Sequence, residues 1–177
     1  AVGLLSAAAI AASEENARGH LVITAPTGGS AGVMPSIVYA LQEGRKISRE
    51  KLREGMLAAL AVGYLCKHHA TLAAAEGGCQ AEIGVASAMA AALIATAHNA
   101  DSRVVENAAE SALEHHLGLT CDPVAGYVQV PCIERCAFGA VKAWTAYAIA
   151  SNEIANNHRV GLDETVQALA QTAKDMN

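Results

Sequence analysis

The sequence is poor in aromatic residues and in basic residues. It holds one Phe, one Trp and four Tyr, only 12 Lys and Arg, and a net charge of −5. Because no basic run is present to neutralise a phosphate backbone, we expect no nucleic-acid binding. The Ala-rich stretch in the middle of the chain without charge or histidine, Ile83–Ala97, is shorter than the ~20 residues of a membrane span. We therefore expect a buried core helix and no membrane partner.

Alanine is what the chain has in excess, with 40 of 177 residues inside an apolar fraction of 53%. This much apolar surface offsets the ordering entropy of a chain, so disorder is excluded. The length suits one domain, and no composition shift or internal repeat divides it. Alanine costs least in a helix and lets helix backbones approach closely. The composition predicts a single compact all-α domain over residues 1–177.

Hydrophobic periodicity and stop signals predict about seven helices joined by Gly/Pro-rich loops. The segment His20–Ala25 is β-like, but it has no partner strand. Ser48, Asp101 and Asp163 are the predicted N-caps, and Gly44 is a predicted stop. The predicted helices cover approximately residues 2–16, 35–44, 48–75, 79–98, 101–118, 132–156 and 163–177.

The cysteines are odd in number, five, and no small secreted scaffold surrounds them, which indicates reduced thiols in a cytosolic protein. Cys79, Cys121 and Cys132 lie at predicted loops or helix ends, where thiolates can converge on one point. Cys66 lies inside a predicted helix and fits core packing. Cys136 lies one turn after Cys132 and is either a fourth ligand or a neighbour.

The spacing of the three loop cysteines leaves two interpretations open. The three cysteines are separated by 42 and 11 residues. These spacings match neither the closely spaced cysteines of ferredoxins nor the paired cysteine motifs of zinc ribbons. A metal or cluster and buried free thiols both fit this pattern. If a metal is bound, three protein ligands leave one position open, which permits Lewis-acid chemistry on a substrate.

A loop of small residues, Ala25–Gly32 with the sequence APTGGSAG, leads into a predicted helix. Glycines let backbone N–H groups turn toward a carboxylate or phosphate, and a helix N-terminus adds partial positive charge. The loop lacks both the glycine spacing of the dinucleotide fingerprint and the lysine of a Walker loop. An anion-binding loop and a purely structural turn both fit these residues.

Further ionisable side chains flank the cysteines. His116 precedes Cys121 at a helix end and can face the site, but its apolar neighbours on the same helix face favour a core histidine. Glu76, Glu82 and Glu134 each lie within three residues of one of the three cysteines. They are candidates for supporting a metal site or for solvated positions at helix ends.

Three segments resemble the α domain of iron–sulfur-dependent L-serine dehydratases, and the likeness extends over nearly the whole chain. The segments are Thr24–Pro35, Ala75–Ala92 and Gly118–Arg135. The resemblance implies an oxygen-sensitive [4Fe-4S] cluster held by Cys79, Cys121 and Cys132, and no pyridoxal phosphate. It further implies that the open iron acts as a Lewis acid on the hydroxyl of L-serine, which is converted to pyruvate and ammonia.

The same resemblance assigns Thr27, Gly28, Gly29 and Ser30 to the substrate, through its carboxylate. The family's catalytic base, a histidine in a Ser-His motif of an N-terminal β region, has no counterpart in this sequence, so the base is unknown here. Two positions depart from the family pattern: Gly28 stands where an Asn is expected, and Cys136 stands where another Asn is expected. Cys136 is thus a candidate surrogate ligand.

The expected partners are L-serine, a β domain of the same enzyme in the same or another chain, and like chains in a homo-oligomer. We expect a cytoplasmic C-terminal fragment that lacks the β domain and the extreme C-terminal tail, and that does not turn over serine unaided. The alternative is a non-catalytic helical subunit or interaction domain whose cysteines hold zinc or remain free. A third hypothesis is that residues 25–32 bind a phosphate compound.

Overall fold

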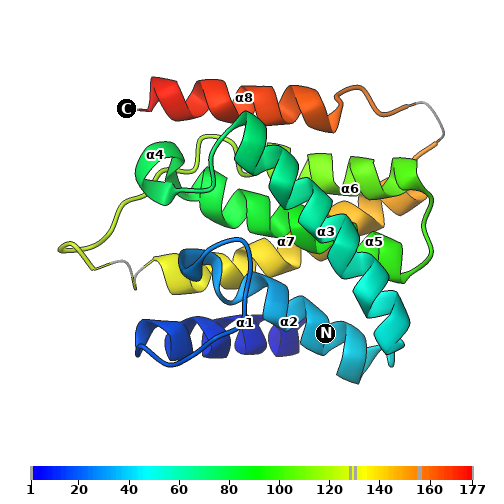
Figure 1. Ribbon diagram of the computed structural model, residues 1–177, viewed down its shortest axis with the longest axis horizontal. Helices are drawn as coiled ribbons and strands as arrows, with labels where there is room; N and C mark the ends of the chain where they lie inside the picture. The colour runs from blue at the N-terminus through cyan, green and yellow to red at the C-terminus, as the bar shows by residue number, and fades with distance from the viewer. Residues whose placement is uncertain (1, 128, 130, 155–156, 177) are drawn as a thin grey trace.

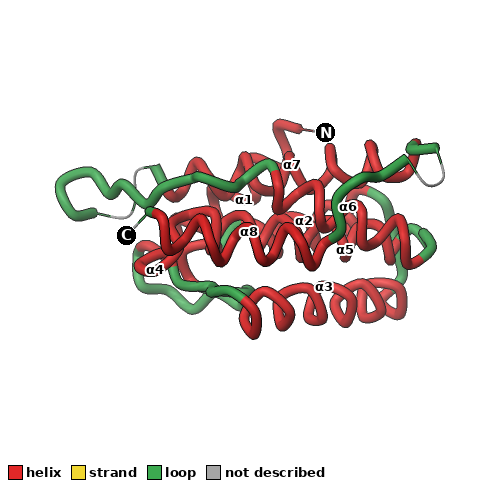
Figure 2. Tube along the Cα trace, turned by 90° about the horizontal axis from the view of Figure 1, so that it is seen from above, coloured by secondary structure: helices red, strands yellow, loops and turns green. Residues whose placement is uncertain are grey.

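The computed structural model describes residues 2–127, 129, 131–154 and 157–176, and this part of the chain is helical without strands (Figure 2). The α-helices are α1 (Val2–Ala17), α2 (Val33–Tyr39), α3 (Arg49–His69), α4 (Ala74–Cys79), α5 (Val85–Ala97), α6 (Ser102–Glu114), α7 (Cys132–Asn152) and α8 (Leu162–Asp175). A 3₁₀ turn, η1 (Gly28–Ser30), precedes α2, while π-helical turns η2 (Ala40–Gly44) and η3 (Gln80–Gly84) extend α2 and join α4 to α5. Counted with these joins, the described elements form seven helical segments, and the all-α prediction is confirmed.

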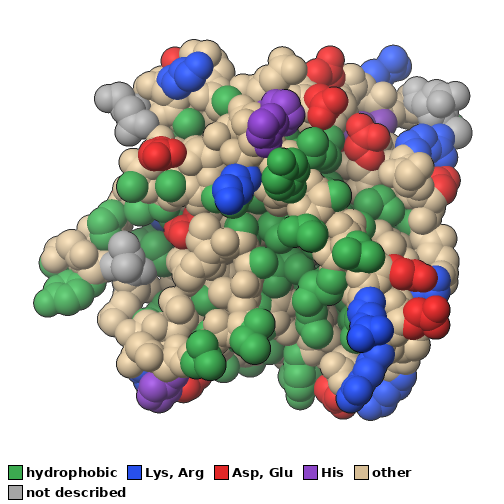
Figure 3. Space-filling view, viewed as in Figure 1, with side chains coloured by type: hydrophobic (Ala, Val, Ile, Leu, Met, Phe, Trp, Pro, Cys, Tyr) green, Lys and Arg blue, Asp and Glu red, His purple; other side chains and the backbone are tan. Residues whose placement is uncertain are grey.

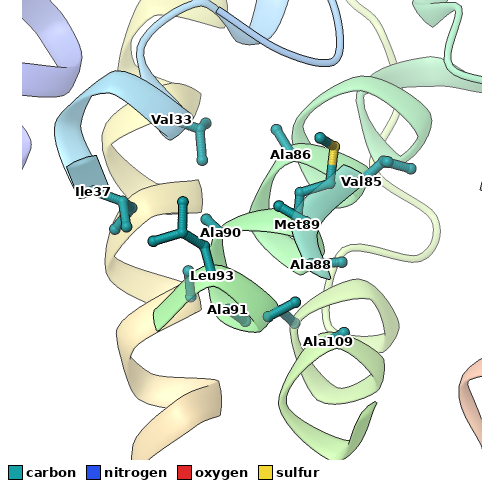
Figure 4. Packing of buried hydrophobic residues seen from close by; sticks show 14 of the residues in the cluster. Val33, Ile37, Val85, Ala86, Ala88, Met89, Ala90, Ala91, Leu93 and Ala109 are labelled. Carbon is teal, nitrogen blue, oxygen red and sulfur yellow. The ribbon is translucent and has the colours of Figure 1, made fainter. Parts of the chain in front are cut away.

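Helix α5 lies at the centre of the molecule and packs against α2, α3, α6 and α7 (Figure 1). Nearly all of its side chains are buried, and most are alanines (Figure 4). Close approach is essential here: a Cβ at Gly55 of α3 would lie 2.8 Å from the Leu93 carbonyl oxygen of α5. The alanine excess thus serves the packing of helices around one buried helix.

The run Ala74–Ala97, which joins α4, η3 and α5, is long and apolar enough to cross a membrane by length and composition alone. Its most apolar 18-residue window is 94% buried inside the protein. Burial on all sides is typical of the core helix of a folded domain. The predicted core helix over residues 83–97 is therefore confirmed.

Two of the predicted N-caps are present. The backbone N–H of Lys51 donates to Ser48 Oγ (3.3 Å), and that of Val104 donates to Asp101 Oδ1 (2.9 Å). The third is displaced: α8 is capped at Gly161, whose N–H donates to the Glu164 carboxylate (2.8 Å), so Asp163 lies inside the first turn. The prediction of Asp163 as the cap is therefore wrong by two residues.

Other boundaries also shift. Helix α3 ends at His69 and does not reach Ala75, because Thr71 Oγ1 accepts a hydrogen bond from the Ala73 N–H and turns the chain. Helix α7 ends at Asn152, and the end predicted at Asn156 lies outside the described residues. The β-like segment 20–25 forms a loop without strand pairing.

The three cysteine-bearing segments meet at one end of the bundle, where α4, the start of α7 and the loop after α6 lie side by side (Figures 1 and 2). Helix α3 crosses the face seen in Figure 3, and it carries a row of exposed apolar side chains there. These are Met56, Leu57, Leu60 and Tyr64. The fold thus places the candidate site at the end of the bundle and an apolar face on its side.

Candidate metal centre and substrate cavity

Cys79, Cys121 and Cys132 come together although they are distant in sequence. Cys79 ends α4, Cys121 lies in the loop after α6, and Cys132 is the first residue of α7. The Cys79 thiol lies within hydrogen-bonding reach of both other thiols. Cys79 is fully buried, whereas Cys121 is partly exposed. The result is a three-thiol group with one side open to solvent.

Gln80 holds the end of α4 against the loop that follows α6. The Gly118 N–H donates to Gln80 Oε1 (2.9 Å), and the Gln80 N–H donates to the Leu119 carbonyl oxygen (3.0 Å). Gly78 permits this contact, since its φ is +68° and a Cβ there would lie 2.7 Å from the same carbonyl oxygen. This backbone contact brings together two cysteines that are 42 residues apart.

Arg135 connects the thiol group to its loop. Its Nη1 donates to Cys79 Sγ (3.2 Å) and to the Thr120 carbonyl oxygen (3.0 Å), while Nη2 lies 2.7 Å from Asp122 Oδ1. One guanidinium therefore contacts the thiol of one cysteine and both neighbours of Cys121. A cation at this distance stabilises the thiolate form, which is the form that binds metals.

The pKa of each thiol in the group is raised, and burial is the largest cause for all three. A neighbouring thiol adds to the rise in each case, although the hydrogen bond with Cys79 opposes the rise in the pKa of Cys132. The Arg135 guanidinium opposes the rise in the pKa of Cys79 by its hydrogen bond and its charge. Glu82 adds to the rise in the pKa of Cys121 and Cys132. Metal binding here must displace protons, because only thiolates ligate.

A cavity of about 580 Å³ opens beside Cys121 and Cys132. The loop Thr27–Ser30 forms part of its wall, because Gly28 and Gly29 line it. Asn16 of α1 also lines it, and its Nδ2 donates to the Gly28 carbonyl oxygen (2.9 Å). The structure therefore brings the predicted substrate loop and two of the predicted ligands to one cavity.

The hydroxyls of the loop face inward. Thr27 Oγ1 donates to Glu82 Oε1 (2.6 Å), and Ser30, which is fully buried, donates from Oγ to the Thr27 carbonyl oxygen (3.1 Å). A Cβ at Gly29 would overlap the Glu82 carboxylate. A side chain at Gly29 would therefore force the Glu82 carboxylate to move from this position.

Cys136 lies next to this loop. Its buried thiol donates to the Gly29 carbonyl oxygen (3.5 Å), and burial raises its pKa. Glu76 accepts a hydrogen bond from Thr71 Oγ1 (2.6 Å) and lies in a separate shallow pocket that Cys121 also lines. Glu134 is exposed in the first turn of α7. The structure thus places Cys136 against the loop that lines the cavity, while neither glutamate is among the residues that line it.

His116 is part of the core. It is 2% exposed, and its Nδ1 lies 2.7 Å from the Ala112 carbonyl oxygen. A Cβ at Gly84 would lie 2.8 Å from the His116 Cβ, so the ring packs against η3. Among the described residues that line the cavity, no histidine occurs.

Burial of His116 predicts a loss of stability in acid. Desolvation lowers its pKa from 6.5 to about 4. Between these values the unfolded chain binds a proton that the native protein does not, so stability falls as the pH drops from 6.5 toward 4. The expected contribution is about 3 kcal/mol. Urea unfolding at neutral pH and near pH 4 measures it.

The control is the neighbouring exposed histidine. His116→Gln should remove most of this acid-dependent loss, whereas His115→Gln should retain it. An identical pH dependence in the two variants would contradict the assignment.

Among the described residues, no set of three or more His, Cys, Asp and Glu side chains is spaced to hold a single metal ion. Sequence reasoning had not assigned a role to Gln80, Arg135 or Asn16. Gln80 is a fully buried polar residue in an apolar helix, and Arg135 lies one helical turn after Cys132. Both features can be seen in the sequence, but the residues that Gln80 and Arg135 contact lie in distant segments of the chain.

Comparison with known proteins identifies relatives of this chain. The family model described as "Serine dehydratase alpha chain" matches residues 3–177. An L-serine dehydratase of Helicobacter pylori is 46% identical over 178 residues, which cover 99% of this chain and 39% of that protein. L-serine dehydratase 2 of Escherichia coli is 48% identical, and an L-serine dehydratase of Streptomyces coelicolor 44%, each over 170 residues that cover 96% of this chain and 37% of the relative.

The match is therefore nearly complete for this chain, but it spans about two fifths of the length of these curated relatives. A family model that covers residues 3–177 includes the cysteine-bearing segments, the loop before α2 and all eight described α-helices. The resemblance found in the sequence is thus confirmed: the chain belongs to the serine dehydratase alpha chain family.

Proposed function

We propose that this chain is the cluster-binding part of an L-serine dehydratase, a carbon–nitrogen lyase that converts L-serine to pyruvate and ammonia. The observation that carries the proposal is the convergence of Cys79, Cys121 and Cys132 beside a cavity that Cys121 and Cys132 line. The reaction is the one for which the relatives, L-serine dehydratases, are named. The chain's partners would be L-serine, the remainder of such an enzyme, and like chains in a cytoplasmic homo-oligomer.

The donor set fits a [4Fe-4S] cluster. Three thiols on three different segments are the ligand type of iron–sulfur clusters, and one side of the group is open. Cys79, Cys121 and Cys132 would hold the cluster, with Arg135 compensating the charge of one thiolate. When bound, the cluster would supply Lewis acidity that lets the serine hydroxyl depart.

The residues of this chain would bind and orient the substrate. Gly28 and Gly29 expose backbone to the cavity without an intervening Cβ, which suits N–H donation to the serine carboxylate. Three consecutive small residues, Ala73 to Ala75, line another part of the wall and limit the space for water. Holding serine in one orientation next to the thiol group would keep its reacting groups in position and so lower the barrier to the reaction.

The reaction removes a Cα proton and the β-hydroxyl from serine as water. The resulting aminoacrylate tautomerises to an imine, and water then hydrolyses the imine to pyruvate and ammonia. We place the proton acceptor in the part of the relatives' length that this chain does not cover. We therefore expect the 177-residue chain to bind the cluster but not to turn over serine unaided.

Anaerobic iron and sulfide analysis tests the proposal most directly. After reconstitution, the chain should hold about four irons and about four acid-labile sulfides, with the broad visible absorption of thiolate-to-iron charge transfer. Binding of zinc in preference to iron, without visible absorption, would overturn the proposal. Titration of the loaded chain with L-serine and with inorganic phosphate separates the carboxylate site from a phosphate site at the loop.

A further inference from the structure

The cavity beside the thiols carries one charged side chain among the described residues that line it, and that side chain is Glu82. The other described residues of the wall are small, polar or apolar, and none is basic. The cavity is therefore electrostatically negative, which favours a ligand with a cationic group.

The position of Glu82 is fixed from two sides. It belongs to η3, and its Oε1 accepts a hydrogen bond from Thr27 Oγ1 (2.6 Å). The carboxylate also packs against the backbone of Gly29, where a Cβ would overlap it. Among the described residues, no donor bonds to Glu82 Oε2. One carboxylate oxygen is thus held by the loop, and the other remains as an acceptor.

These features match the two charges of an amino acid. The backbone of Gly28 and Gly29 lines the cavity and suits a carboxylate. Glu82 contacts the same loop through Thr27, also lines the cavity, and suits an ammonium group. An α-amino acid carries both groups on one carbon atom, so its two charges must be met close together. A carboxylate that accepts from an ammonium donor forms a charge-assisted hydrogen bond, which is among the stronger polar contacts in proteins.

We propose that Glu82 binds the α-ammonium group of the substrate and thereby selects amino acids over hydroxy acids that lack it. This inference rests on the proposed function and adds a specificity-determining residue to it. Glu82 contacts the substrate itself in this proposal, and its hydrogen bond with Thr27 sets its orientation.

The test compares two ligands that differ only in the ammonium group. The iron-loaded chain is titrated anaerobically with L-serine and with 3-hydroxypropionate, and binding is followed by the change in visible absorption. Glu82→Gln keeps an oxygen that can accept from Thr27 and removes the charge. The wild-type chain should prefer L-serine, and Glu82→Gln should weaken L-serine binding about 10- to 100-fold while leaving 3-hydroxypropionate unchanged.

Two further variants make the result specific. Glu82→Asp keeps the charge and should restore part of the preference for L-serine. Glu54→Gln removes the same charge from the exposed Lys51–Glu54 pair on α3 and should bind both ligands as the wild type does. Iron content and circular dichroism of each variant establish that the cluster and the fold are retained.

Several outcomes would overturn the inference. If Glu82→Gln weakens both ligands equally, Glu82 has a structural role only. If it weakens neither, the ammonium group is bound elsewhere. A Glu82→Gln chain that no longer loads iron, together with a Glu82→Asp chain that loads iron but shows no preference, also contradicts it. A wild-type chain that takes up no iron refutes the proposed function instead, and this is seen before any variant is compared.

Discussion

Cys79→Ala, Cys121→Ala and Cys132→Ala should each reduce the iron content of the anaerobically reconstituted chain from about four per chain to below about one. Each substitution removes one of three thiols that lie together, two of which line the cavity. Neither of the other two cysteines can take the place of the one removed. Cys66 is buried inside α3, and the Cys136 thiol donates to the Gly29 carbonyl oxygen. Iron and sulfide analysis, with the visible spectrum, measures the loss.

The other two cysteines provide the controls. Cys66 is fully buried inside α3, where burial raises its pKa to about 12, so Cys66→Ala should load iron normally. Cys136 donates to the Gly29 carbonyl oxygen, and Cys136→Ala should also retain the cluster. Full iron loading of a variant in which Cys79, Cys121 and Cys132 are all replaced would refute the assignment of these residues as ligands. Loss of iron in Cys136→Ala would instead identify Cys136 as a surrogate ligand.

Gly78→Ala should lower the free energy of unfolding by about 4 kcal/mol. The φ of +68° at this position disfavours any residue with a Cβ, and the new methyl group would lie 2.7 Å from the Leu119 carbonyl oxygen and 2.8 Å from Met176 Cε. The first atom belongs to backbone, so it cannot rotate away. For a chain of this length, the loss corresponds to a decrease in Tm of about 10 °C.

Gly118→Ala is the matched control for this prediction. Gly118 also has a left-handed φ, +80°, but a Cβ there would meet no atom within 4 Å. The expected loss is about 1 kcal/mol, from backbone conformation alone. The difference between the two variants isolates the cost of the contact between the end of α4 and the loop after α6. Equal losses in thermal unfolding would show that this contact is looser than the structure has it.

The fold could be predicted largely because its signals are local. Alanine content, helical periodicity and the side chains of Ser48 and Asp101 act within one or two turns of the chain, and both caps form as expected. The end of α3 and the wide turn η3 were missed, because they depend on neighbouring segments. Within η3, Gly84 faces His116 in the turn after α6, and no local pattern indicates that partner.

The candidate site could likewise be predicted only where its signals are local in the sequence. The three cysteines of the cavity were singled out because turn residues flank them, which is visible in the sequence alone. The pairing of Glu82 with Thr27 spans 55 residues, and that of Arg135 with the Cys79 thiol spans 56. Contacts of this kind arise only when helices are placed in space. Sequence patterns therefore identified ligand candidates, whereas the charges around them required the structure.

The π-helical turn η3 lies between Cys79 and the central helix α5. A π-turn contains one residue more than the α-helical turn it replaces, and its wider winding takes up that residue without turning the preceding segment away from α5. Deleting one residue within η3 should therefore leave Cys79 close to its present position. Deleting one residue within α5 has no wide turn to take up the change and would rotate Cys79 by about 100° relative to the residues that follow. The bundle therefore tolerates a change of length in the five residues of η3 that it does not tolerate in α5.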